Sequence, residues 1–337
     1  MNSPTTPVRA RRLGLYGPLI ALAIAAVAWS LGWLWLKGEV GRRLDAARQS
    51  GSGAALTWTG RRVYGYPFRL DVDFTGVSWR EPTGWGLTAP TLKTETFVFA
   101  PGHWMAIAPD GVILSRPEGG DVRVTARVLR ASLSGLDGHP PTFSLEGLGL
   151  AFTPVAGASP YFLRDAAELH AHTRAGPADQ GAFYVELDRA TANGALGQVA
   201  AGKPVNVIAD AIYSHAGALA GPSWASAIGA WSGAGGQINL RRIRLVAGET
   251  TLDAHGATLS IDGEGRLAGA LVGRLSRGAA ALTALSEAGI VDPAVARTAA
   301  TVLAASPAGA AEPVTLDFQA GRTTLGPVAV GASPKVY

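Results

Sequence analysis

The sequence predicts a mainly β protein, in which a single N-terminal transmembrane helix is followed by a long antiparallel β meander or curled sheet. Two observations support this fold class. An apolar run of 24 residues without a charge lies near the N-terminus. After it, short segments that alternate apolar and polar residues recur between turn sequences such as Asp-Gly and Gly-Gly. The curled sheet could form either a half-open groove or a sandwich.

The apolar run extends from Leu13 to Leu36, between Arg12 and Lys37. As a helix it is about 36 Å long, which exceeds the roughly 30 Å of hydrocarbon in a bilayer. We therefore expect a signal anchor that contacts the lipid membrane from Leu13 to Leu36. A cleaved signal peptide is the alternative, because residues 26–28 (AVA) resemble a cleavage site. The apolar run continues for eight residues beyond that site, which favours the anchor.

The charge distribution indicates where the rest of the chain lies. The net charge of +4 belongs to the N-terminal segment, since residues 38–337 carry 25 basic and 25 acidic side chains. Positive charges flank the apolar run on both sides, so counting them does not fix the orientation. A short tail before a first membrane helix normally stays in the cytoplasm. We therefore expect a single-pass protein of the bacterial inner membrane with the bulk of its chain in the periplasm.

The predicted organisation has four parts. They are a cytoplasmic tail (1–12), the transmembrane signal anchor (13–36), a stalk or linker (37–53) and an extracytoplasmic β-rich domain (54–337). Within the domain, residues 223–232 predict a short helix, and residues 277–306 predict a C-terminal helical hairpin with Asp292-Pro293 at the start of its second helix. Strands are expected at 55–59, 68–74, 76–80, 91–100, 104–108, 111–115, 121–134, 142–150, 182–187, 205–208, 237–245, 250–261, 266–275, 314–318, 323–325 and 328–330.

Known catalytic and metal-binding patterns are not matched by this sequence. There is no cysteine, which excludes disulfides, thiolate metal sites and a cysteine nucleophile. Residues 197–203 resemble a phosphate-binding loop, but Pro204 replaces the Ser or Thr that holds magnesium. His170 and His172 share one strand face and could begin a metal site, although two exposed histidines are the simpler interpretation. We expect no enzyme activity, no cofactor and no metal.

Nucleic acid is not an expected partner. A nucleic-acid-binding domain usually carries a basic patch, because phosphate contacts dominate its affinity. Residues 38–337 have no net charge, and their only dense basic cluster is formed by Arg241, Arg242 and Arg244. Such a cluster is typical of one solvated strand face.

Two segments carry a family resemblance. They are residues 65–72 (GYPFRLDV) and residues 85–92 (WGLTAPTL). Together with the N-terminal helix, the segment 292–304 and the turn Leu325-Gly326-Pro327, they resemble the bacterial family known as domain of unknown function 2125. The resemblance implies a membrane-anchored envelope protein and no particular activity. In outline the chain is also similar to AsmA-like proteins, which implies a β-rich groove behind a membrane helix.

Two functions remain open at this level. The first is lipid handling, in which the apolar sheet face lines a groove for a phospholipid or another acyl chain. The candidate lining residues are Phe68, Leu70, Val72, Phe74, Leu92, Phe97, Phe99, Val122, Val124 and Val128. The second is a structural or interaction protein of the envelope, in which the same residues form a closed core and the ligand is a partner protein. Arg69, Asp71 and Asp73 are expected on the solvated face in both cases.

Overall fold

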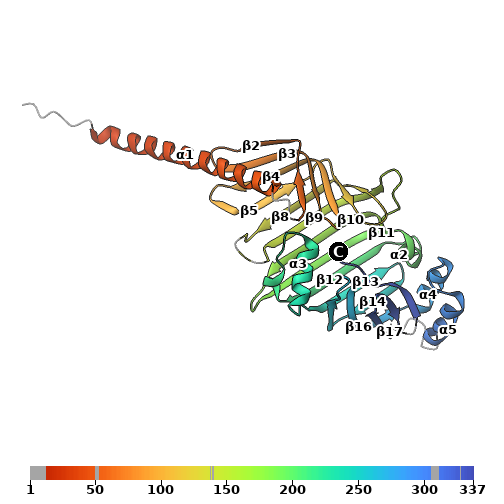
Figure 1. Ribbon diagram of the computed structural model, residues 1–337. Helices are drawn as coiled ribbons and strands as arrows, with labels where there is room; N and C mark the ends of the chain where they lie inside the picture. Colours follow the sequence, from red (N-terminus) through yellow and green to blue (C-terminus); the bar gives the residue numbers. More distant parts are fainter. Residues whose placement is uncertain (1–12, 50–52, 137, 139, 305–310, 327) are drawn as a thin grey trace, which may run out of the picture.

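The computed structural model describes residues 13–49, 53–136, 138, 140–304, 311–326 and 328–337. Three predicted parts lie outside these residues. They are the tail at 1–12, residues 50–52 of the linker and Pro327 of the family turn. Helix α1 (Leu13–Gln49) is one continuous helix that contains both the apolar run and the stalk sequence. It projects from the sheet as a long shaft (Figure 1).

The rest of the chain is mainly β, as predicted. Short helices lie between or after the strands: α2 (Gly194–Ala200), η1 (Ala216–Ala218), α3 (Trp224–Gly233), α4 (Gly278–Glu287) and α5 (Pro293–Ala304). The strands are β1 (Ala55–Thr57), β2 (Gly60–Tyr64), β3 (Arg69–Arg80), β4 (Gly86–Phe97), β5 (Ala100–Ile107), β6 (Val112–Ser115), β7 (Val122–Thr125), β8 (Val128–Ser134), β9 (Thr142–Pro154), β10 (Leu163–Ala175), β11 (Gln180–Ala192), β12 (Val205–Ser214), β13 (Ile238–Ala247), β14 (Thr250–Ala254), β15 (Ala257–Ile261), β16 (Leu267–Ser276), β17 (Ala311–Gln319), β18 (Arg322–Leu325) and β19 (Val328–Ala332).

All strand pairs in the described chain are antiparallel, and the strands form one sheet. Its path is close to a meander. β1 and β2 pair with one edge of β3, and β4 pairs with the other edge. The sheet continues through β5 and β6, then β8 and β7, to the long strands β9, β10, β11, β12 and β13. It ends with β14 and β15 beside β16, followed by β17, β18 and β19.

The sheet curls around its main hydrophobic core. That core joins buried side chains from strands as far apart as β3, β7, β9 and β12, including Val72, Val122, Leu150 and Val205. The first edge of the sheet also meets the segment before α3, where the Ala54 amide donates to the Pro222 carbonyl at 3.1 Å. The curled sheet and the C-terminal helical hairpin confirm the predicted fold class.

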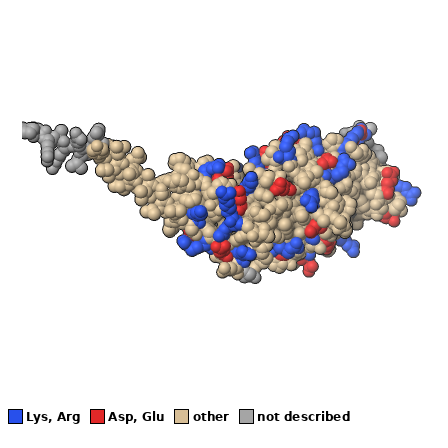
Figure 2. Space-filling view, turned by 90° about the horizontal axis from the view of Figure 1, so that it is seen from above, with Lys and Arg blue, Asp and Glu red and all other residues tan. Residues whose placement is uncertain are grey.

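Charged side chains are unevenly distributed along the molecule. Viewed from above, α1 carries no charged side chain along its projecting part, and Lys, Arg, Asp and Glu begin where the helix meets the sheet (Figure 2). Almost all of the apolar part of α1 is exposed, so it is not a core helix of this chain. By length and composition, α1 could cross a membrane.

Candidate functional site

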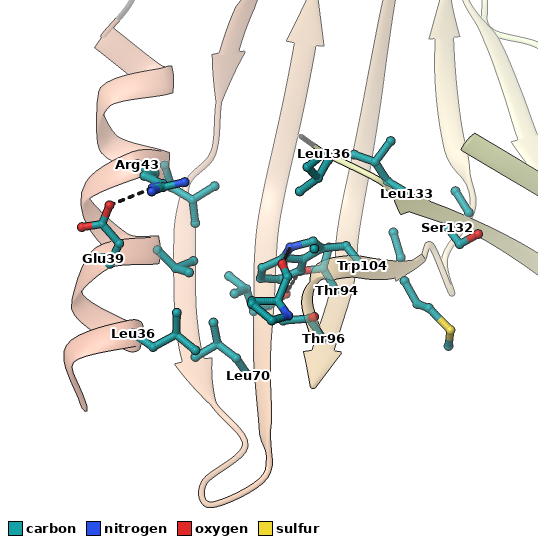
Figure 3. Close-up of a pocket in the computed structure, with 18 of the residues that line it drawn as sticks. Leu36, Glu39, Arg43, Leu70, Thr94, Thr96, Trp104, Ser132, Leu133 and Leu136 are labelled. Carbon is teal, nitrogen blue, oxygen red and sulfur yellow. Dashed lines mark hydrogen bonds and ion pairs between the residues drawn. The ribbon is translucent and has the colours of Figure 1, made fainter. Parts of the chain in front are cut away.

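A cavity of about 790 Å³ lies between the second half of α1 and the first part of the sheet. Its volume falls within the range of ligand pockets in proteins, roughly 300–1,000 Å³. Side chains from α1, β3, β4, β5, β8 and the start of β9 surround it (Figure 3). The lining residues are Trp35, Leu36, Glu39, Val40, Arg43, Leu44, Leu70, Val72, Phe74, Thr94, Thr96, Pro101, Gly102, Trp104, Met105, Ala106, Ala131, Ser132, Leu133, Leu136 and Phe143.

The helical wall of this cavity comes from one stripe of α1. Leu36, Val40 and Leu44 are four residues apart, so they share one helix face, and all three line the cavity. The stripe is held against the sheet by β2. The Arg61 guanidinium donates to the Asp45 carboxylate at 3.0 Å and to the Gly41 carbonyl at 3.2 Å. Because these contacts lie beyond the apolar run, the stalk is docked on the domain and forms part of the candidate site.

The strand wall is apolar in chemistry although it contains hydroxyl groups. Leu70, Val72 and Phe74 face the cavity from β3. The neighbouring β4 contributes two threonines whose hydroxyls are already bonded to the backbone. Thr94 Oγ1 donates to the Val72 carbonyl at 3.0 Å, and Thr96 Oγ1 lies 2.6 Å from the His103 carbonyl. These hydroxyls therefore hold the strands in place, which leaves the strand wall mainly apolar.

Two charged residues stand on the helix side of the cavity. Arg43 Nε donates to a Glu39 carboxylate oxygen at 2.7 Å, and Arg42 donates to the other oxygen at 2.5 Å. These bonds to Arg43 and Arg42 lower the pKa of Glu39 from its usual value of 4.5. The Arg43 side chain is 80% exposed and marks the outer rim, whereas Glu39 is half-buried. The rest of the lining consists mainly of aliphatic and aromatic side chains (Figure 3).

The structure brings only part of the predicted lining together. Leu70, Val72 and Phe74 line the cavity, with Val72 and Phe74 also part of the main hydrophobic core, and the other seven residues do not line it. Val122 and Val124 lie in the closed core, and Leu92 packs against it. Val128 is half-buried in β8. Phe68, Phe97 and Phe99 are exposed at strand ends, and the centroid of the Phe68 ring lies 6.3 Å from that of the Trp29 ring of α1.

The alternation at residues 68–74 also needs correction. The strand β3 begins at Arg69, so Phe68 belongs to the turn before it and is 62% exposed. Asp71 was expected on the solvated face but is buried, with 4% of its surface exposed. Its Oδ2 accepts from Arg69 Nη2 at 3.0 Å, whereas its Oδ1 has no hydrogen-bond partner among the described residues. Burial raises the pKa of Asp71 above its usual value of 3.8, against the lowering effect of Arg69.

The two histidines considered as the start of a metal site lie on β10. His170 and His172 stack with their ring centroids 6.4 Å apart, and His172 stacks on Tyr184 of β11. Among the residues that the structure describes, no group of three His, Cys, Asp or Glu side chains could hold a metal ion. The phosphate-loop lookalike at 197–203 covers the end of α2 and the turn before β12.

Sequence comparison places the chain in a family. A family model described as "Uncharacterized protein conserved in bacteria (DUF2125)" matches residues 33–334. The chain belongs to this family. The match begins within α1 and covers nearly all of the sheet, which confirms the resemblance seen in residues 65–92. No curated protein and no solved structure matches this DUF2125 chain, so the similarity to AsmA-like proteins stays a prediction.

Proposed function

We propose that this protein is a membrane-anchored, non-enzymatic protein of the bacterial envelope that holds an acyl chain of a phospholipid in the cavity between α1 and the sheet. The observation that carries this proposal is the composition of the cavity. Its walls are apolar, its threonine hydroxyls are bonded to the backbone, and one wall is the helix that carries the apolar run. Each buried CH₂ would contribute about 0.8 kcal/mol, so a chain could be retained without specific hydrogen bonds.

The position of the cavity supports a lipid rather than a soluble ligand. Trp35 and Leu36, at the end of the charge-free run, are part of the lining. A helix that spans the membrane with this run therefore places the cavity next to the membrane surface. We further propose that α1 anchors the chain in the inner membrane and that residues 37–337 lie in the periplasm. Lipid could then enter the cavity without crossing an aqueous gap.

The test measures bound phospholipid on the full-length protein by native mass spectrometry after release from detergent micelles. Ala131 lines the cavity from β8, and Ala131→Trp would fill much of the space with an indole ring. We expect wild type to retain phospholipid and Ala131→Trp to lose most of it. The matched control is Ala270→Trp, because Ala270 is exposed on β16, away from the cavity.

Lipid that only coats the membrane helix should remain on both variants. Lipid bound in the cavity should remain on Ala270→Trp and be lost from Ala131→Trp. Equal retention by both variants contradicts the proposal, as does a wild-type protein that carries no phospholipid. The second result would favour the alternative function, in which the closed core of this fold serves an interaction with an envelope protein. Thermal unfolding of both variants shows whether the Ala131 substitution has left the fold intact.

A further inference from the structure

Two strand turns form an aromatic surface beside the apolar run of α1. The turn between β2 and β3 presents Tyr66 and Phe68, which are 55% and 62% exposed. The turn between β4 and β5 presents Phe97 and Phe99, which are 50% and 70% exposed and stack at 5.1 Å. We call these four residues the aromatic tip. The two turns are joined directly, because the Val98 amide donates to the Phe68 carbonyl at 3.0 Å.

The aromatic tip is attached to α1 by hydrogen bonds from tryptophan side chains. Trp29 Nε1 donates to the Pro67 carbonyl at 2.9 Å, and Trp33 Nε1 donates to the Arg69 carbonyl at 2.9 Å. The Tyr66 ring packs edge-on against Trp33, at a centroid distance of 5.6 Å. In Figure 1 the β2–β3 turn and the β4–β5 turn lie beside the second half of α1. The position of the tip along the membrane normal is therefore fixed by α1.

The contacts place the tip at a definite depth. A hydrocarbon layer of roughly 30 Å covers about 20 helical residues. When this layer is centred on the run from Leu13 to Leu36, its outer boundary falls near Leu34. Trp33 then lies about 2 Å inside the boundary and Trp29 about 8 Å inside it, by the helical rise per residue. The turn that bonds to both indoles must reach a similar depth.

Several polar groups of the turn between β2 and β3 are paired within the protein. The Gly65 carbonyl accepts from the Arg69 amide at 3.0 Å, and the Pro67, Phe68 and Arg69 carbonyls have the partners described above. The Tyr66 hydroxyl lies 2.8 Å from Ser30 Oγ. Because hydrocarbon offers no hydrogen bonds, each of these internal pairs lowers the cost of placing the turn at this depth.

Charge also stops at the base of the tip. Residues 64–68 and 96–109 contain no Lys, Arg, Asp or Glu. The nearest charged side chains, Arg69 and Glu95, face each other across β3 and β4 with 3.2 Å between Nη1 and Oε2. An uncharged aromatic surface bordered by charge is typical of a membrane interface, where aromatic rings are favoured.

We propose that the aromatic tip is embedded in the outer leaflet of the bilayer beside α1, so that the sheet itself enters the membrane and the cavity opens at the lipid surface. This inference rests on the proposed membrane anchor and not on lipid retention in the cavity. It gives the domain two membrane contacts, a spanning helix and an inserted pair of turns. The domain is then held at a fixed tilt and height, which a single helix on a free linker would not provide.

The test uses depth-dependent fluorescence quenching, for which the absence of native cysteine is an advantage. Phe68→Cys and Phe99→Cys are made separately in the full-length chain, labelled with the fluorophore NBD and reconstituted into phosphatidylcholine and phosphatidylglycerol vesicles. The quencher is phosphatidylcholine with a doxyl group on its acyl chain. Leu31→Cys, on the exposed side of α1, is the control inside the bilayer. Phe162→Cys, 53% exposed in the loop before β10, is the aqueous control.

We expect emission from positions 68 and 99 to fall as much as emission from position 31, while emission from position 162 is unchanged. Quenching at position 31 without quenching at 68 and 99 overturns the inserted tip but leaves the anchor intact. No quenching at any of the three positions overturns the anchor and the tip together. The outcome of the Ala131→Trp experiment, whether the lipid is lost or retained, has no bearing on these readings, so the two proposals fail separately.

Discussion

At the scale of single residues, Asp71 is the clearest departure from the expected pattern. It is buried on β3, and one of its carboxylate oxygens has no hydrogen-bond partner within the described part of the chain. Burial raises the pKa of Asp71 above 3.8. The folded state therefore binds a proton more readily than the unfolded state does. The contribution of Asp71 to the free energy of unfolding is therefore most favourable when its carboxyl is protonated. This contribution decreases as the pH rises from 3.8 through the folded-state pKa.

This argument predicts that Asp71→Asn raises the thermal midpoint of the full-length protein at pH 7, because the amide removes the cost of a buried charge. The gain should shrink as the pH approaches 3.8, where the wild-type carboxyl is itself neutral. Unfolding curves at several pH values measure both effects. Asp110→Asn, at an exposed turn, is the control and should change nothing. A lower midpoint for Asp71→Asn at pH 7 would show that the ion pair with Arg69 outweighs desolvation.

At the scale of elements, helix α3 is tied to the distant strand β3 by one carboxylate. Both oxygens of Glu81, which is 5% exposed, lie 3.1 Å from the Trp224 amide at the first turn of α3. A negative charge at a helix N-terminus is favourable because it meets free N–H groups and the positive end of the helix dipole. This contact joins residues that are 143 positions apart, so it helps to close the curl of the sheet.

We expect Glu81→Ala to lower the free energy of unfolding by about 1–3 kcal/mol, the cost of losing a hydrogen bond to a charged group. Denaturant titration followed by circular dichroism measures the change. Glu118→Ala, at an exposed position in the turn after β6, is the matched control. A result within the error of this control would mean that Ser223, which caps α3 through its side chain, suffices to hold the helix.

The elements differ in how far their sequences predict them. The period of two identified most strands, including β7, where Val122 and Val124 are buried and Arg123 is exposed. Of strand β10, the sequence predicts only the strand face shared by His170 and His172, because the segment is rich in alanine and in charged residues, which do not favour β structure by themselves. It is a strand because β9 and β11 pair with both of its edges.

The cavity was predictable only in part. Leu70, Val72 and Phe74 follow from alternation, and the stripe of Leu36, Val40 and Leu44 could have been found from its spacing of four. The opposite wall could not be found in this way. Its side chains come from β5, β8 and the start of β9, and they meet α1 only because the sheet curls. Local periodicity contains no information about such long-range packing.

At the scale of the whole molecule, orientation decides which leaflet of the membrane the cavity and the aromatic tip would face. Flanking positive charges do not decide the orientation. Every strand of the described chain follows α1, so the whole sheet lies on the C-terminal side of the helix. If the residues before α1 stay in the cytoplasm, as expected from the sequence, the whole sheet must be carried across the membrane. The cavity would then collect lipid from the outer leaflet of the inner membrane.

We predict that a membrane-impermeant maleimide labels Asp110→Cys in intact cells but labels Ser3→Cys only after the inner membrane is broken. The cysteine-free chain makes each variant a single-site reporter. The mass of the purified protein, measured in parallel, should include residues 1–28, because we expect an anchor that is not cleaved. Labelling of Ser3→Cys but not Asp110→Cys in intact cells would reverse the orientation and move the cavity to the cytoplasmic leaflet. A mass that lacks residues 1–28 would remove the proposed anchor, and with it the basis for placing the aromatic tip in the membrane.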